Sequence, residues 1–403
     1  MLLTMVSCAR TERVVTLSVP SRSNANATIA SDGSRVIVAW GATGQQGTDI
    51  YAAVSKDGGR RFGAPIRVND AAGEASVSGE QPPRVDLRGE AIEVVWVAKR
   101  GGLPSIRAAS SRGGASFAAS RAVSPPSLMG ARGWQSAAIA DDGSVHAVWL
   151  DGRFAASGSN VGHTHGAGHG HGAADPRQDV YHAVWRDGAA LQEVRVDTDV
   201  CFCCKTAIVT RGQDVYTAWR DLFPGGVRDI SVAHSTDGGR TFDTPARVSA
   251  DNWKINACPD DGPALALDGA GALHVVWPTM VDDNGTPRIA IFHAVTRDGR
   301  TFSARERVDG ARGTDPAHPR IAARADGRLA VVWDELSNGA RRIALRTFEP
   351  DADGGGAWTD VRVVSDDRGA NYPAVTLTPD AVVVAWTARQ GERPRIRVAR
   401  VVE

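Results

Sequence analysis

Cysteine and histidine side chains gather in two short stretches of this 403-residue sequence. One stretch carries three closely spaced cysteines, and a fourth follows later in the chain: Cys201, Cys203, Cys204 and Cys258. The other is a Gly-rich run that contains His163, His165, His169 and His171. Thiolate and imidazole ligands together suit copper(I) or zinc(II). The pattern predicts a metal site in which cysteines supply soft ligands and the histidines deliver the ion or hold a second one.

Other interpretations of these residues remain open. Four cysteines in an oxidising compartment commonly form disulfides, and three pairings are possible. A bridge from Cys201 or Cys204 to Cys258 would join two segments of the chain. The adjacent Cys203 and Cys204 are hard to place in one disulfide network without strain, which keeps the metal site open as an alternative. The histidine run is also compatible with a flexible low-complexity loop.

A repeated strand positions these residues. An alternating Val-rich segment that ends in Trp recurs seven times, with Trp-to-Trp steps of 56, 53, 70, 58, 56 and 53 residues. The seven residues are Trp40, Trp96, Trp149, Trp219, Trp277, Trp333 and Trp386. Each unit holds further alternating segments between Gly-rich turns, which predicts four antiparallel strands per unit. Seven copies at this period predict an all-β, seven-bladed β-propeller with little helix.

The repeats predict a single domain over residues 12–403. The last unit ends after its third strand, so the segment 13–19 is expected to add the outer strand and close the ring. The step of 70 residues reflects a His/Gly-rich insertion at about 155–176, between the second and third strands of the third blade.

Residues 1–11 precede the predicted ring. Their short apolar run ends at Cys8 and resembles the tail of a bacterial lipoprotein signal, in which Cys8 would be lipidated. That interpretation places the protein outside the cytoplasm, in the periplasm or anchored to the outer membrane of a bacterium. The alternative is a disordered cytoplasmic terminus.

Two turns between third and fourth strands fit the pattern S-x-D-x-G-x-x-F. They contain Ser55, Asp57, Gly59 and Phe62, and then Ser235, Asp237, Gly239 and Phe242. This pattern is the Asp box, and the chain resembles the sialidase-like propellers over nearly its whole length. In such a turn Ser and Asp side chains bond turn amides, and Gly supplies a positive φ. The motif is specific for the fold and says little about activity.

Strand order decides which loops share a face of the ring. The Asp boxes lie on one face, whereas the segments that lead into the innermost strands lie on the other, at the mouth of the central channel. The four cysteines, the His-rich insertion and His318 all belong to the channel-mouth face. Such mouths favour ligand sites, so we expect the metal there, with His318 as a further ligand.

The resemblance also implies a possible hydrolase. Sialidases clamp a carboxylate with an arginine cluster, and use an Asp as acid/base and a Tyr activated by a Glu. The residues of these types on the channel-mouth face are Arg153, Arg220, Arg320, Asp151, Asp221 and Tyr372. The family's aromatic-Arg-Ile-Pro signature is absent, and catalytic sialidase domains resemble six-bladed rings. Arg and Asp near strand ends are also commonly exposed ion pairs. The resemblance therefore implies the fold, and the activity is not carried over.

A third possibility is a propeller that binds glycans or proteins without catalysis, because fold does not imply function. The repeated tryptophans are expected in the core, which leaves Trp134 as the candidate for an exposed aromatic. The 46 basic and 46 acidic residues give zero net charge, which argues against a nucleic-acid partner. We expect a monomer that contacts a membrane only through a lipid at Cys8.

Overall fold

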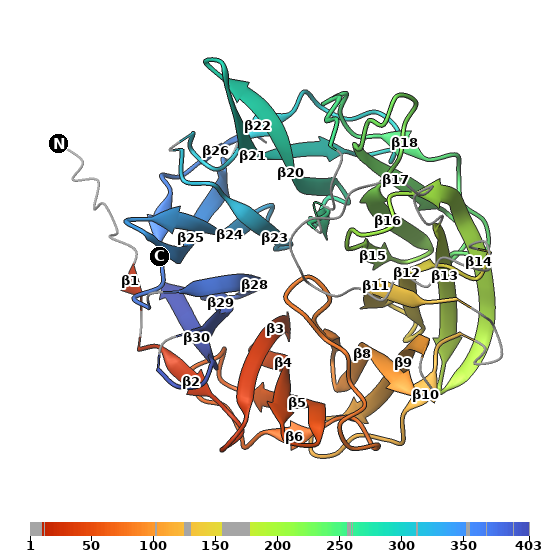
Figure 1. Cartoon of the computed structure of the whole chain (residues 1–403), viewed down its shortest axis with the longest axis vertical. Coiled ribbons are helices and arrows are strands. Elements are labelled where there is room, and N and C mark those ends of the chain that lie inside the picture. Colours follow the sequence, from red (N-terminus) through yellow and green to blue (C-terminus); the bar gives the residue numbers. More distant parts are fainter. Residues whose placement is uncertain are drawn as a thin grey trace.

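The computed structural model describes residues 10–11, 13–100, 103–124, 130–154, 178–255, 259, 261–311, 313–351, 355–367, 369–389 and 391–402. Within these ranges the chain forms strands only, arranged as seven antiparallel sheets around a central channel (Figure 1). The described residues accordingly include no helix long and apolar enough to cross a membrane. The predicted all-β, seven-bladed propeller is confirmed.

Each blade runs from an innermost strand at the channel to a short outer strand. The first three blades are β3 (Ser23–Asp32), β4 (Arg35–Gly44), β5 (Gly47–Ser55) and β6 (Ile66–Arg67); β7 (Arg84–Arg88), β8 (Ala91–Arg100), β9 (Leu103–Arg112) and β10 (Arg121–Ala122); and β11 (Arg132–Ile139), β12 (Val145–Asp151), β13 (Gln178–Arg186) and β14 (Ala189–Val200). The next two are β15 (Ala207–Arg211), β16 (Asp214–Arg220), β17 (Ile230–Ser235) and β18 (Ala246–Arg247); and β19 (Ala264–Leu267), β20 (Leu273–Asp283), β21 (Thr286–Thr296) and β22 (Glu306–Arg307). The sixth is β23 (Ala317–Ala323), β24 (Leu329–Ser337) and β25 (Ala340–Pro350), with β26 (Gly356–Trp358) and β27 (Arg362–Val363) both paired to β25.

The seventh blade closes the ring with the N-terminal segment. Its own strands are β28 (Ala370–Thr378), β29 (Ala381–Ala388) and β30 (Arg395–Val402). Both β2 (Val15–Leu17) and β1 (Arg10–Thr11) pair with β30, so the predicted closure is confirmed. The ring begins at Arg10, slightly before the expected boundary at residue 12. Closure removes the exposed sheet edge that an open ring would leave.

The core lies between neighbouring blades. The repeated tryptophan of every blade is fully buried, as expected. Several of their indoles donate to a side-chain oxygen, as Trp40 does to Asn24 at 2.9 Å and Trp333 does to Glu335 at 2.9 Å. These hydrogen bonds remove the cost of burying an indole N–H.

Trp134 corrects one prediction, because it is only 5% exposed. It takes a φ of 60° at a bulge in β11, and its ring packs among buried side chains between the third and fourth blades. The expectation of an exposed aromatic at this position is wrong.

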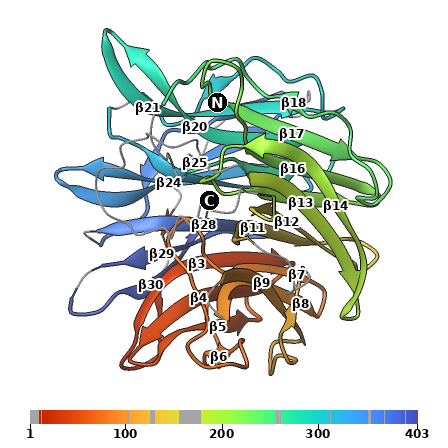
Figure 2. The same ribbon diagram turned by 45° about the vertical axis from the view of Figure 1, so that its right-hand side comes forward.

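The two Asp-box turns form the hydrogen bonds expected of them. Gly59 N donates to Ser55 Oγ at 2.9 Å, and Arg61 N donates to Asp57 Oδ1 at 2.9 Å. The turn also bonds the loop between the first two strands, because Gly58 N donates to Ser34 O at 2.8 Å. The turn of the fourth blade repeats this pattern at Ser235 and Asp237. Figure 2 shows the blades obliquely, with the long strands β13 and β14 on the side that is turned forward.

Candidate functional site

Three of the predicted cysteines converge in the segment that leads from β14 into β15. The Sγ atom of Cys201 lies 3.6 Å from that of Cys204 and 4.0 Å from that of Cys203. All three sulfur atoms lie within 4.8 Å of one another. A disulfide requires a separation of about 2.05 Å, and no disulfide joins these three cysteines to one another. Cys201, Cys203 and Cys204 are referred to below as the sulfur cluster.

The spacing of the sulfur cluster matches the requirement of a single metal ion. A metal–sulfur bond of about 2.3 Å places the sulfurs of a tetrahedral or trigonal site roughly 3.7–4.0 Å apart. The distances from Cys201 Sγ to the other two sulfur atoms, 3.6 and 4.0 Å, fall close to that range. An ion therefore fits between the sulfurs with little movement of the chain.

The surroundings of the sulfur cluster exclude water. The three cysteines are 0–2% exposed and belong to one apolar core cluster with Trp134, Phe202 and Trp219. The backbone after the cysteines is fixed, because Thr206 Oγ1 donates to Trp134 O at 2.7 Å. A dry apolar shell strengthens electrostatic interactions within it and shields thiolates from solvent.

Two described arginines, Arg220 and Arg228, act on the sulfur cluster. Arg228, in the loop between β16 and β17, donates from Nη1 to Cys201 Sγ at 3.3 Å. Hydrogen bonds from Cys203 and Cys204 hold the pKa of Cys201 well below its usual value, and the Arg228 guanidinium acts in the same direction. Burial raises the pKa of Cys204 well above its usual value. The cluster is thus prepared to carry one thiolate, the form of cysteine that ligates metals.

A second group of side chains meets at the channel mouth. It is referred to below as the charged cluster, and it consists of Glu80, Lys205, Asp261, His318 and Asp334. His318 lies between two carboxylates, with Nε2 at 2.7 Å from Glu80 Oε1 and Nδ1 at 2.5 Å from Asp334 Oδ2. Lys205 is fully buried, pairs with Asp261 and lies 3.6 Å from Glu80 Oε2. Figure 1 shows the loop between β6 and β7, which carries Glu80, reaching over the middle of the ring.

The charges of this cluster determine the protonation of His318. Burial by itself would lower its pKa, but Glu80 and Asp334 override that effect and raise the pKa to about 10. Burial opposes ionisation of Glu80 as well, yet Lys205 and His318 lower its pKa to about 2. His318 is therefore an imidazolium near neutral pH, and both of its ring nitrogens donate to carboxylates. In this state it has no lone pair to offer a metal.

Bulges in the innermost strands aim these residues at the mouth. His318 and Tyr372 have φ values of 57° and 52°, at register shifts in β23 and β28. Asn26 and Trp134 occupy the same kind of position in β3 and β11. The rings of His318 and Tyr372 lie 4.3 Å apart, and burial, followed by Glu80 and Asp334, raises the pKa of Tyr372 to about 12. The bulge therefore recurs as a device that turns one side chain out of register.

The channel beneath the mouth holds two arginines. A cavity of about 160 Å³ is lined by residues from all seven innermost strands, and only Arg84 and Arg320 among them carry a charge. Arg84 Nε donates to Gln135 O at 3.1 Å, and Arg320 Nη1 donates to Pro319 O at 3.1 Å. Within the described ranges neither guanidinium forms an ion pair at contact distance, although the charge of Glu80 acts on both. Burial, and then the charge of Arg320, lower the pKa of Arg84 to about 9.

The other hydrolase candidates have separate partners. Arg153 lies 2.7 Å from Asp151 and 2.7 Å from Glu193, and its guanidinium covers the Tyr181 ring. Arg220 donates to backbone oxygens, including those of Arg228 and Pro278, both at 2.9 Å. Neither arginine lines the channel cavity.

Asp221 accepts a hydrogen bond from Ser231 Oγ at 2.8 Å, and burial raises its pKa. Of the six predicted residues, the structure therefore brings Arg320 and Tyr372 to the charged cluster.

Several predicted residues lie outside the described ranges. They are Cys8, His163, His165, His169, His171 and Cys258. The strands that flank the His-rich insertion are β12 and β13, which agrees with its predicted place between second and third strands.

Sequence reasoning missed Glu80, Arg84, Lys205 and Arg228. Lys205 did carry a signal, because it is one of few lysines in the chain and directly follows Cys204. Arg228 carried none, since its contact with Cys201 depends on how the loop after β16 folds back. Glu80 likewise owes its position to a loop rather than to the repeat.

No family model and no curated protein matches the chain. Solved structures do share its fold. An ulvan lyase of polysaccharide lyase family PL25 aligns over 97% of this chain and 96% of its own, at 12% identity and a TM-score of 0.56. The polysaccharide lyase Uly1 aligns over 94% and 90%, at 9% identity and 0.55. The endosialidase of phage phi92 aligns over 97% and 69%, at 10% identity and 0.51. The chain therefore has the fold of the sialidase-like β-propellers, the resemblance that its Asp-box turns indicate.

Proposed function

We propose that this propeller binds a soft transition-metal ion, copper or zinc, at the sulfur cluster. The observation that carries the proposal is the spacing of three buried sulfur atoms at 3.6 and 4.0 Å, without a disulfide between them. Three buried sulfur atoms at these separations are placed as ligands of one common ion would be. An acid–base or nucleophilic role for Cys201 would need contact with a substrate, whereas these side chains are sealed from solvent.

Copper(I) suits the sulfur cluster better than zinc. Thiolates select copper(I), which accepts low coordination numbers, whereas structural zinc takes four ligands. Three cysteines complete a trigonal copper(I) site. Zinc would require a fourth ligand, for which Cys258 is the candidate that the sequence offers next to β19. The histidines of the insertion, His163, His165, His169 and His171, are proposed to deliver the ion or to hold a second one.

Metal analysis of protein purified under reducing conditions tests this function. We expect one copper(I) per chain after loading, and none in the Cys203→Ser/Cys204→Ser variant. Cys8→Ser is the matched control and should keep the full content. Cys258→Ser distinguishes copper(I) from zinc as the bound ion, because it should lower zinc binding and leave copper(I) binding intact. Unchanged metal content in the double variant would contradict a metal site at the sulfur cluster.

The proposed location is outside the cytoplasm, with a lipid at Cys8. Its support is the apolar run that ends at Cys8, which resembles the tail of a lipoprotein signal. Membrane fractionation of the wild type and of Cys8→Ser tests it. Equal release of both proteins into the soluble fraction contradicts the anchor.

A second candidate function is the binding of an acidic glycan at the channel mouth. The observation that favours it is the pair Arg84 and Arg320, two half-buried guanidiniums that line one cavity and form no ion pair at contact distance in the described ranges. The PL25 ulvan lyase was solved with bound -[GlcA(1-4)Rha3S]-, a uronate-containing ligand.

Calorimetry with a uronate oligosaccharide and with sialyllactose tests this candidate. Binding should be lost in Arg84→Gln/Arg320→Gln. A fluorogenic sialoside tests sialidase activity in the same preparation. Folded wild-type protein that neither binds nor cleaves these sugars rules the candidate out.

A further inference from the structure

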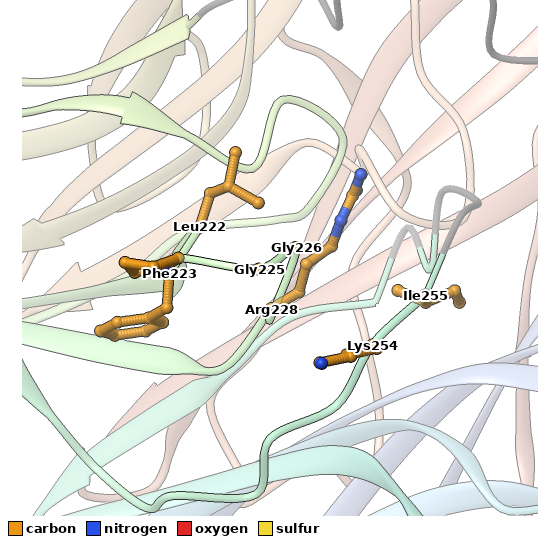
Figure 3. A pocket seen from close by; sticks show the side chains of 8 residues that line it. Leu222, Phe223, Gly225, Gly226, Arg228, Lys254 and Ile255 are labelled. Atoms are coloured by element: carbon orange, nitrogen blue, oxygen red, sulfur yellow. The ribbon is translucent and has the colours of Figure 1, made fainter.

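The sulfur cluster is sealed, so a metal needs a route to it. A pocket with a volume of about 810 Å³ lies beside the cluster, because its lining residue Arg228 also contacts Cys201. Figure 3 shows its lining side chains, which include Leu222, Phe223, Gly226, Arg228, Lys254 and Ile255. They come from two segments, the turn between β16 and β17 and the stretch that follows β18.

The two segments that form the pocket are fastened to each other. Phe223 N donates to Val227 O at 2.8 Å across the turn, and Val227 forms an isolated bridge with Lys254. Arg228 N donates to Trp253 O at 2.8 Å. The pocket wall is therefore held by backbone hydrogen bonds, and its shape does not depend on a long free loop.

Arg228 connects this pocket to the sulfur cluster. Its side chain lines the pocket, and its Nη1 donates to Cys201 Sγ at 3.3 Å. The Arg228 side chain thus lies between the pocket and Cys201 Sγ. Among the described residues, the cluster also packs against large buried rings, such as Trp134 at 5% and Phe202 at 6% exposure. A rotation of Arg228 would open a path that these rings do not offer.

We propose that the pocket is the port through which copper(I) reaches the sulfur cluster, and that Arg228 is its gate; this inference rests on the proposed metal site. The carrier that fits is a small anionic copper(I) complex, because Lys254 places an exposed cation on a wall whose other described lining residues, apart from the gate Arg228, are apolar. Copper remains copper(I) throughout. Bonds from copper to the carrier break as bonds to cysteine sulfur form, and the thiol protons leave to solvent or to the released carrier.

Loading kinetics test the port on the full chain. The probe is the anionic copper(I) complex of bicinchoninate, whose colour is lost as the protein takes the metal. Leu222→Trp should slow loading, because it narrows the mouth, while the final copper content stays the same. Leu336→Trp is the matched control, since Leu336 is 43% exposed and Leu222 is 41% exposed. Lys254→Glu should slow loading about tenfold at low salt, with the difference shrinking as salt screens the charges.

Substitutions of the gate residue Arg228 should accelerate copper(I) loading, whereas Leu222→Trp and Lys254→Glu should slow it. Arg228→Ala removes the hydrogen bond to Cys201 and should accelerate loading about tenfold. Arg228→Lys, which keeps the charge and part of the reach, should lie between Arg228→Ala and the wild type. Identical loading rates in Leu222→Trp, Leu336→Trp and wild type overturn the port.

A measurement without metal separates the port from the metal site. N-Ethylmaleimide is applied to the metal-free protein, and mass spectrometry follows modification of Cys201, Cys203 and Cys204. The expected order of rates is Arg228→Ala, then wild type, then Leu222→Trp. If this order holds while the wild type binds no copper, the metal proposal fails and the port stands. If copper binds but all variants are modified equally fast, the port fails and the metal site stands.

Discussion

Two clusters on the channel-mouth face are neighbours in sequence and opposites in chemistry. Cys204 ends the sulfur cluster, and the next residue, Lys205, belongs to the charged cluster. In the charged cluster the members satisfy one another, because Lys205 pairs with Asp261 and Glu80 while His318 bonds Glu80 and Asp334. In the sulfur cluster three weakly hydrogen-bonding thiols face one another inside an apolar shell.

The comparison of the two clusters indicates that burial alone does not identify a binding site. Both clusters lie largely out of solvent. The ionic groups of the charged cluster pair with one another, so we interpret that cluster as part of the structural framework. The sulfur cluster brings together donor atoms that have little to offer each other and much to offer an ion. We therefore expect loss of the charged cluster to cost stability and loss of the sulfur cluster to cost metal binding.

The largest effect is expected at Lys205. Lys205→Met leaves Asp261 buried without its ion-pair partner and Glu80 with His318 in place of two cations, which should lower the free energy of unfolding by about 3–5 kcal/mol. Urea denaturation measures it. Lys254→Met, at an exposed lysine, is the control and should cost less than about 0.5 kcal/mol. A Lys205→Met protein as stable as the control would erase the proposed contrast between the two clusters.

Copper should stabilise the protein only through the sulfur cluster. At a free copper(I) concentration about 100 times the dissociation constant, binding adds about 2.7 kcal/mol to the free energy of unfolding. Urea denaturation with and without buffered copper(I) measures the gain. The Cys203→Ser/Cys204→Ser variant should show none. A gain of equal size in that variant would move the metal to another part of the chain.

The charged cluster should weaken in alkali. The pKa of His318 is about 10 in the folded protein and about 6.5 in an unfolded chain, so its contribution is complete below pH 6.5 and disappears as the pH rises towards 10. Between pH 7 and pH 9 the loss should amount to roughly 2–3 kcal/mol. The control is His318→Gln, which should be less stable at pH 7 and lose little more by pH 9. Parallel pH profiles for the two proteins contradict the assignment.

The sequence revealed the framework because the framework repeats. Trp149 and Trp219 end equivalent strands of neighbouring blades, and the longer step between them located the insertion correctly. The Asp boxes and the order of strands then assigned each loop to a face. Such features are local or periodic, and a single chain displays them.

The chemistry of the channel mouth was only partly visible, because its contacts join different blades. Cys201, Cys203 and Cys204 were found because all three lie in one short segment. Glu80 and Lys205 are 125 positions apart in the chain, and no period predicts that they meet. Trp134 was misjudged because its exposure depends on a bulge with positive φ, which the residues around it do not reveal.

Buried histidines without carboxylate contacts should respond to pH in the opposite direction from His318. His146 Nδ1 lies 3.1 Å from His182 Nε2, and burial lowers their pKa values to about 4 and about 3. Each is neutral in the folded protein, so its contribution to stability is complete above the unfolded pKa of about 6.5 and is lost as the pH falls below it. Between pH 7 and pH 6 this pair should cost roughly 1 kcal/mol, measured by urea denaturation. His146→Gln/His182→Gln keeps polar groups at both positions and should flatten that part of the profile. If the free energy of unfolding of the double variant falls as steeply between pH 7 and pH 6 as that of the wild type, the acid sensitivity belongs to other groups. In that case His146 and His182 do not form the proposed contrast with His318.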